Sequence, residues 1–380
     1  MSIFKPITAD DKVSTKTLLH EAIPITGTIV SGTYGTFQLE ENVQNFTHGM
    51  FQSVHDYPYL SSSANHIFDI TFGTAAGSML TPSQQETKKD NIYNQMAQIL
   101  MGYDANGNIQ AFDDDGNITN GGTKINDAIF LSLSRLLVKD EIKKGSFELE
   151  LGVNSDYDLP MSKRIKILDK GAATSFRVNS PAGEYGILYA TASLDDDPTA
   201  PLGILDFTNA TSVNIDGDNF YRAGLIYYQA GVVVLTSSVL STTGSGGGNG
   251  FLVDCGDPRL EFSDTGLTLT GSLVTQEISQ SADFLRHRVY NLQFNNTIEL
   301  NSTVYFCRAK HNEFNYSSNP TYLSGSQVRV KQYTSDPAIS YITSIGLYSA
   351  DNKLLAVGKF SEPIRKDSNI ELTFRARLDY

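Results

Sequence analysis

Three histidines and one aspartate form the densest group of potential metal ligands in the chain. His48, His55, Asp56 and His66 fall within a single short stretch. A zinc or iron site would need three of these side chains to converge on one ion, and their spacing matches neither HExxH nor paired CxxC motifs. Histidines in aromatic surroundings more often pack and form hydrogen bonds. We therefore predict no metal and no cofactor, and leave open whether His48, His55 and His66 converge.

Clustered carboxylates offer a second kind of chemistry, as calcium ligands or as an acid and base pair. Residues 113–115 and Asn117 surround Gly116, but the glutamate that closes an EF-hand loop is missing. Residues 195–197 and the pair Asp216 and Asp218 lie among Gly and Pro, where such clusters normally form solvated turns. A hydrolase of the bacterial envelope stays an alternative only because glycosidase carboxylates pair in space rather than in sequence.

Motifs for nucleophilic catalysis and phosphate binding are missing. No GxSxG elbow precedes a helix, and the histidines have no partners at a recognisable spacing. The glycine-rich segment 241–250, STTGSGGGNG, lacks the Lys and Thr arrangement of a P-loop. The sequence thus predicts a protein that is not an enzyme and has no catalytic residue.

Composition limits the partners. The 380 residues include 42 acidic and 29 basic side chains, for a net charge of −13. This charge disfavours nucleic acid and an anionic membrane surface. No apolar run has the roughly 20 residues of a spanning helix, and the first residues do not resemble a signal peptide. Two cysteines, Cys255 and Cys307, fit a reducing cytoplasm, and whether they pair is left open.

Two helices are expected. One begins at Thr81 and ends near Gly102, with Ile92, Met96, Ile99, Leu100 and Tyr103 on one face. The other covers residues 125–145, INDAIFLSLSRLLVKDEIKKG, which has a cap, an apolar centre and a Lys-Lys-Gly end. Between them NGNI and DGNI repeat and indicate tight turns.

The rest of the chain favours β structure. From Phe147 onward the strand-like runs are 147–153, 185–194, 224–240, 260–274 and 287–306. The fold class is mainly β with a small helical portion (α+β), with antiparallel, sandwich-like domains and a C-terminal antiparallel sheet. We expect an N-terminal extended arm at 1–80, a helical and hairpin region at 81–160, a central β domain at 161–280 and a C-terminal β domain at 281–380.

The final seventy residues carry the most regular pattern. Four strands are expected, in SQVRVKQY, ISYITSIGLYS, KLLAVGKF and NIELTFRARLDY, with a turn at Ala350, Asp351 and Asn352. In the last strand the even positions from Ile370 to Tyr380 are apolar, whereas the odd positions are polar or charged. We expect this strand to form a small antiparallel sheet with the hairpin before it.

The segment YITSIGLYSADNKLLAVGKFSEPI resembles a hairpin of structural proteins associated with the tail and baseplate of tailed bacteriophages. Four further segments resemble virion structural proteins of contractile-tailed phages of marine bacteria. They are TLLHEAIPITGTIVSGTYG, HGMFQSVHDYPYLSSSANHIFDITFG, IYNQMAQILMGYD and VNSPAGEYGILYA. The resemblance implies a place in a virus particle assembled in the bacterial cytoplasm, but it implies no catalytic residue.

The functional prediction is a multi-copy tail or baseplate protein that acts by assembly with other phage structural proteins and with copies of itself. The alternatives are a neck or capsid-surface protein and a receptor-binding or glycan-binding module of the tail, although the chain lacks Trp, the strongest sugar platform. We expect the edge strands and the N-terminal arm to carry the interface. The residues named for it are Tyr341, Ile345, Leu347, Tyr348, Leu355, Val357, Phe374 and Tyr380.

Overall fold

The computed structural model confirms a mainly β protein, with 53% strand and 12% helix. The residues that it describes are 4–26, 41–75, 85–116, 123–152, 161, 164–194, 212–240, 277–317, 323–324, 327–328, 333 and 335–380. They form two compact units. We call His20–Ile298 the core unit, and Met1–Leu19 together with Glu299–Tyr380 the terminal unit. Strands β1 (Lys12–Thr26) and β14 (Val289–Ala309) contribute residues to both.

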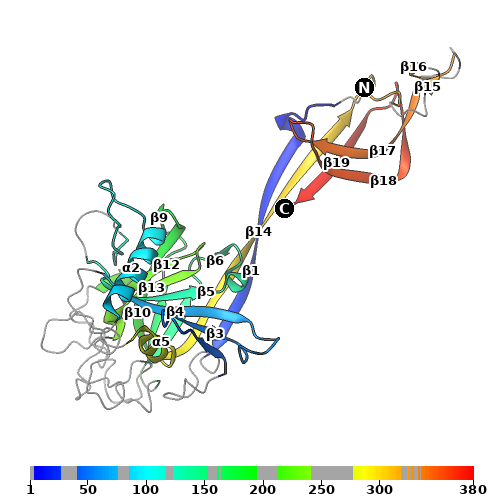
Figure 1. Ribbon diagram of the computed structural model, residues 1–380. Coiled ribbons are helices and arrows are strands. Elements are labelled where there is room, and N and C mark those ends of the chain that lie inside the picture. The colour runs from blue at the N-terminus through cyan, green and yellow to red at the C-terminus, as the bar shows by residue number, and fades with distance from the viewer. Residues whose placement is uncertain are drawn as a thin grey trace, which may run out of the picture. The chain divides into compact units, whose positions relative to one another are not determined.

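The core unit is built on one large sheet with antiparallel neighbours (Figure 1). Its strand order from β14 is β14-β7-β8-β10-β12-β13-β5-β4-β3-β2. The bounds are β2 Val43–Asn45, β3 Gln52–His55, β4 His66–Thr74, β5 Asp127–Leu133, β7 Glu148–Gly152, β8 Arg164–Leu168, β10 Gly183–Leu194, β12 Asp218–Tyr227 and β13 Val232–Thr236. Three short strands pair beside this path, namely β6 (Glu141–Ile142), β9 (Arg177–Ser180) and β11 (Ser212–Ile215).

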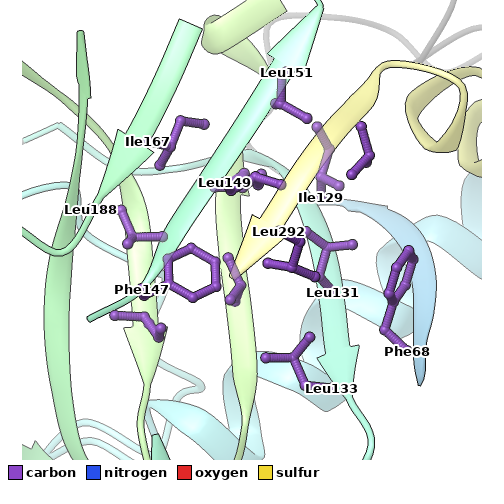
Figure 2. Packing of buried hydrophobic residues seen from close by; sticks show 14 of the residues in the cluster. Phe68, Ile129, Leu131, Leu133, Phe147, Leu149, Leu151, Ile167, Leu188 and Leu292 are labelled. Atoms are coloured by element: carbon purple, nitrogen blue, oxygen red, sulfur yellow. The ribbon is translucent and has the colours of Figure 1, made fainter. Parts of the chain in front are cut away.

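The sheet buries both of its faces. One apolar cluster takes residues from β14 and β7 near one end of the strand order and from β4 and β3 near the other, so the sheet curves around it. Figure 2 shows Leu131 of β5, Leu149 of β7 and Leu292 of β14 in this cluster. The opposite face carries a second cluster, covered by the helix α2 (Glu86–Leu100).

The segment 125–145 was predicted to be a helix, and this prediction was wrong. Residues 127–133 form strand β5, followed by the short helix α3 (Arg135–Val138) and by β6. Ile129 and Leu131 point into the first cluster, whereas Ala128 and Phe130 point into the second. A strand buried on both faces has a continuous apolar run, which periodicity alone does not distinguish from a buried helix.

The helix predicted near residue 92 is confirmed as α2, but its buried face differs in part from the prediction. Ile92 and Leu100 are buried as expected. Ile99 is 63% exposed and Tyr103 lies beyond the helix, 52% exposed. Tyr93 and Ala97 are buried in their place. The predicted start at Thr81 lies outside the described residues.

Close contact between β4 and α2 depends on a glycine. A Cβ atom on Gly73 would lie 2.8 Å from the backbone nitrogen of Tyr93 and 3.0 Å from the carbonyl oxygen of Lys89. Any larger residue would force the helix away from the sheet. A second helix in contact with β4, α5 (Ile278–Arg286), adds Ala282 and Leu285 to the first cluster.

The predicted turns are confirmed where they are described. In NGNI, Gly107 has a φ of +84° and Tyr103 bridges to Ile109. In DGNI, Gly116 has a φ of +69°, and the residues that follow lie outside the described chain. Asp216 forms the tight turn between β11 and β12, as its carboxylate pattern suggested. Residues 195–197, 241–250 and 260–274 are not among the described residues.

The terminal unit is the smaller of the two. Strand β19 (Leu372–Asp379) pairs antiparallel with β14, and β1 stands next to β14 in the strand order. Strands β17 (Ile339–Tyr348) and β18 (Leu354–Asp367) form the expected hairpin, a two-stranded sheet of its own. The prediction that the last strand joins this hairpin was wrong, because β19 continues the sheet of β14 instead. The remaining elements are η1 (Ala9–Asp11), β15 (Leu323–Ser324) and β16 (Gln327–Val328) here, and η4 (Ser237–Leu240) in the core unit.

Candidate assembly surface

The hairpin has a well-defined turn. The backbone N–H of Ser349 donates to the carbonyl of Lys353 over 2.9 Å, and that of Asn352 donates to the carbonyl of Ser349 over 3.0 Å. Asn352 has a φ of +60°, a conformation that Asn tolerates better than most residues. The hydroxyl of Ser349 also accepts a hydrogen bond from the N–H of Lys353 over 3.1 Å. These contacts confirm the turn predicted at Ala350–Asn352.

The pairing register assigns each hairpin residue to a face. Ile345 is paired with Gly358 and Leu347 with Ala356, and directly opposite residues share a face. Leu347 and Ala356 are half-buried. Leu355 and Val357 therefore lie on the other face, where they are 69% and 59% exposed. The hairpin thus has an inner face, which packs within the unit, and an outer face with two bare aliphatic side chains.

The inner face packs on β19 through aromatic contacts. Phe360 of β18 and Phe374 of β19 have ring centroids 4.9 Å apart. On the outer face Tyr348, at the end of β17, lies over Gly346 and meets Phe4 edge to face at 4.8 Å. Along β19 the apolar even positions are half-buried and the odd positions exposed, which confirms the predicted alternation. None of these apolar β19 side chains is fully buried, so the packing yields no closed core.

A buried lysine fixes the base of the hairpin. The ammonium group of Lys366 donates to the carbonyl of His311 over 3.3 Å, to Oδ1 of Asn315 over 2.7 Å and to the carbonyl of Asp367 over 2.8 Å. Lys366 has no exposed surface. Three oxygen acceptors compensate for the loss of its hydration. This contact ties β18 to the loop that follows β14.

Strand β1 presents an open edge. Ser14 and Thr303 join their hydroxyls over 3.0 Å, and His20 meets Thr297 over 3.2 Å, so β1 runs antiparallel to β14. In the described chain, β1 is the last strand in the sheet order and every residue from Lys12 to Ala22 is exposed. An unpaired edge exposes backbone donors and acceptors to any chain that can add a strand.

The two units differ sharply in where their apolar side chains lie. Among the described residues, the terminal unit has only two buried hydrophobic side chains, Val304 and Ala309, and both large clusters belong to the core unit. It nevertheless holds 13 of the 22 large apolar side chains that are exposed. They are Phe4, Ile7, Val13, Leu18, Leu19, Tyr316, Tyr333, Tyr341, Tyr348, Leu354, Leu355, Val357 and Tyr380.

The structure divides the residues expected at an interface into two groups. Exposed side chains belong to Tyr341, Tyr348, Leu355, Val357 and Tyr380. The other three, Ile345, Leu347 and Phe374, are half-buried. No individual residue of β1 was named, because the sequence TKTLLHEAIPIT has apolar residues at both odd and even positions and so lacks a clear strand period.

Within the described residues, the three histidines do not converge on one point. His48 accepts a hydrogen bond from the N–H of Met50 over 3.0 Å and stacks on Phe46. His55 and His66 lie opposite each other on β3 and β4, and Nε2 of His66 is 2.8 Å from Asp69. Burial and His66 lower the pKa of His55, while the hydrogen bond with Asp69 raises that of His66. Within the described ranges, only residues 113–115 bring three potential ligand atoms close together.

Residues 113–115 are held by basic side chains. Lys124 contacts Asp113, which is buried, and Arg222 lies 3.4 Å from Asp114. Burial raises the pKa of both carboxyls. A shallow cleft beside them is lined by Arg177, Arg222 and Asp115 among other residues. Lys124 and Arg222 thus offset part of the negative charge of these three carboxylates.

No helix in the described part of the chain is long and apolar enough to cross a membrane. Cys307 is a half-buried free thiol, and Cys255 lies outside the described residues. Comparison with protein-family models, with characterised proteins and with solved structures finds no match for this chain.

Proposed function

We propose that this chain is a structural subunit that works by assembly in the particle of a tailed bacteriophage, in its tail or baseplate. The observation that carries assembly is the terminal unit, which combines open strand edges with exposed apolar side chains and lacks a buried core among the described residues. Monomeric proteins rarely leave such edges uncovered, because they would aggregate. The phage context rests on the sequence resemblance.

The outer face of the hairpin is the part of this surface that we expect to contact a neighbouring protein. Leu355 and Val357 both lie on this face, and the side chains of Tyr348 and Leu354 lie over Gly346, which is paired with Val357. An exposed apolar patch of this kind buries well against another apolar surface. Because the inner face already packs on β19, a neighbouring protein can dock on the outer face without any rearrangement of the hairpin.

Incorporation into particles tests the proposal. Cells that produce the phage would express the wild-type chain or the variant Leu355→Ser with Val357→Ser, and purified particles would be assayed by mass spectrometry. We expect the wild-type chain at several copies per particle and a loss of at least about tenfold for the variant, which corresponds to about 1.4 kcal/mol of docking free energy. The matched control, Lys359→Ser on the same outer face, should incorporate normally. Purified particles without the wild-type chain would overturn the proposal.

A further inference from the structure

We propose that two copies of this chain pair through their β1 strands, in an antiparallel arrangement centred on Lys16. This inference rests on the proposed function, since it names one partner of the assembly surface. It starts from the edge of β1, whose residues from Lys12 to Ala22 are all exposed. Pro24 lacks a backbone N–H and closes the edge to further pairing at its C-terminal end.

The sequence of β1 is complementary to itself in one register. When Lys16 faces its own copy across a two-fold axis, Val13 faces Leu19 and Thr15 faces Thr17, and each pair occurs twice. Val13 is 47% exposed and Leu19 is 50% exposed, so the pairing covers two bare aliphatic side chains on the same face. Cross-strand aliphatic and Thr–Thr pairs stabilise antiparallel sheets.

The charge at the centre of this pairing is already compensated. Lys16 would face its own copy, and like charges directly opposite are unfavourable. Its ammonium group contacts the carboxylate of Glu299 on β14, so each copy brings a neutral pair to the axis. Ser14 on the same face is bonded to Thr303, which fixes the orientation of this part of β1.

The distribution of charge along the chain favours contact between terminal units. The terminal unit contains 13 of the 29 basic residues and 10 of the 42 acidic residues. The core unit contains the other 16 basic and 32 acidic residues. Two core units in contact would bring two strongly negative surfaces together. Two terminal units have nearly balanced charge, and a two-fold interface uses the same surface of each copy.

Cysteine cross-linking tests the register. In the full chain with Cys255→Ser and Cys307→Ser, we expect Lys16→Cys to form a disulfide dimer under mild oxidation. Lys12→Cys is the matched control, because its own copy would lie eight positions away, about 27 Å along the strand. Thr17→Cys should likewise form no disulfide, because it would face its own copy only in the neighbouring register. Cross-linking at position 17 or 12 instead of 16 would overturn the pairing.

A charge exchange gives a second test without cysteines. Val13→Lys should raise the dimer dissociation constant measured by analytical ultracentrifugation by about tenfold or more, and the added Leu19→Glu should restore it by placing opposite charges across the axis. A wild-type chain that is monomeric at high concentration, or that forms trimers or larger rings, would contradict the inference. Such a result leaves the particle assay untouched, so the two proposals fail separately.

Discussion

The core unit and the terminal unit differ in how far they cover the apolar side chains of their own strands. The core unit curves its sheet around one apolar cluster and covers the other face with α2, so its strands are buried on both sides. The terminal unit leaves many of its apolar side chains exposed to solvent, and its described hydrophobic residues form no closed cluster. A hairpin and a few long strands without a closed core are only marginally stable alone. From this contrast we infer that the core unit carries most of the stability of the chain, and we propose that a neighbouring protein completes the terminal unit.

Truncating an apolar side chain in each unit should separate them most clearly. Leu149→Ala removes a fully buried side chain from the centre of the core unit and should lower the free energy of unfolding by about 2 to 5 kcal/mol. Leu355→Ala, in the terminal unit, should change it by less than about 0.5 kcal/mol. Urea denaturation of the dilute chain measures both values. Equal losses would mean that the two units share one core.

A buried carboxyl should make the core unit less stable as pH rises. Asp169 is 1% exposed, and burial raises its pKa to about 6, although it accepts hydrogen bonds from the N–H groups of Gly145 and Phe147 and from Tyr228. The folded chain then keeps a proton that the unfolded chain releases between about pH 4 and pH 6. The free energy of unfolding should fall across this window by up to about 3 kcal/mol.

Asp169→Asn is the control for this pH effect. It removes the titrating group, so its contribution between about pH 4 and pH 6 should vanish from the pH profile of thermal unfolding. It also costs about 1 to 3 kcal/mol at acidic pH, because an amide nitrogen then faces a backbone N–H that the carboxyl oxygen had satisfied. A variant profile identical in shape to the wild type would show that another group titrates.

The lysine at the base of the hairpin should matter locally and not globally. Lys366→Met leaves the acceptors on His311, Asn315 and Asp367 without their donor, and should weaken β17 and β18 by about 1 to 3 kcal/mol. Hydrogen exchange should rise in the hairpin while β5 and β7 stay protected. Lys359→Met, on the exposed face of β18, should change neither. A fall in core protection would show that the hairpin supports the core unit.

The smallest effect is expected from the exposed carboxyls of the terminal unit, and it has the opposite sign to that of Asp169. The hydroxyl of Ser302 and the guanidinium of Arg377 lower the pKa of Asp379, and His311 lowers that of Glu371. A lowered pKa means that the stabilisation is present above the usual pKa and is lost as pH falls through the folded value. Carboxyl titration by NMR should place both midpoints below those of unfolded peptides. Midpoints equal to those of unfolded peptides would show that these contacts do not form in solution.

Local patterns in the sequence predict part of this fold. Asn352 and the polar residues beside it specify the hairpin turn, and the alternation of β19 specifies its two faces, because both depend on neighbours in the chain. The fold class also follows from such patterns. The partner of β19 does not, since β14 lies more than sixty residues away and offers no complementary signal in the sequence.

The wrong prediction of a helix at residues 125–145 is explained by the burial of β5 on both faces. The run AIFLSL is compatible with a helix or with a strand until the positions of α2 and of the opposite strands are known. The open edge of β1 escapes prediction for a related reason. Its apolar residues Val13, Leu18 and Leu19 lie on both faces of the strand. That they are exposed follows only from the three-dimensional structure, in which no other described element covers them.

The most direct test asks whether the terminal unit needs a neighbour to become a stable structure. Hydrogen exchange of the full chain would be measured first in dilute solution and then at a concentration where copies associate. We predict that the amides of β5, β7 and β13 are strongly protected in both states. The amides of β1 and β19 should exchange rapidly in the dilute chain, and those of β1 should become protected on association. If the terminal strands of the dilute monomer were as well protected as those of the core unit, the terminal unit would be complete by itself, and the account would be wrong.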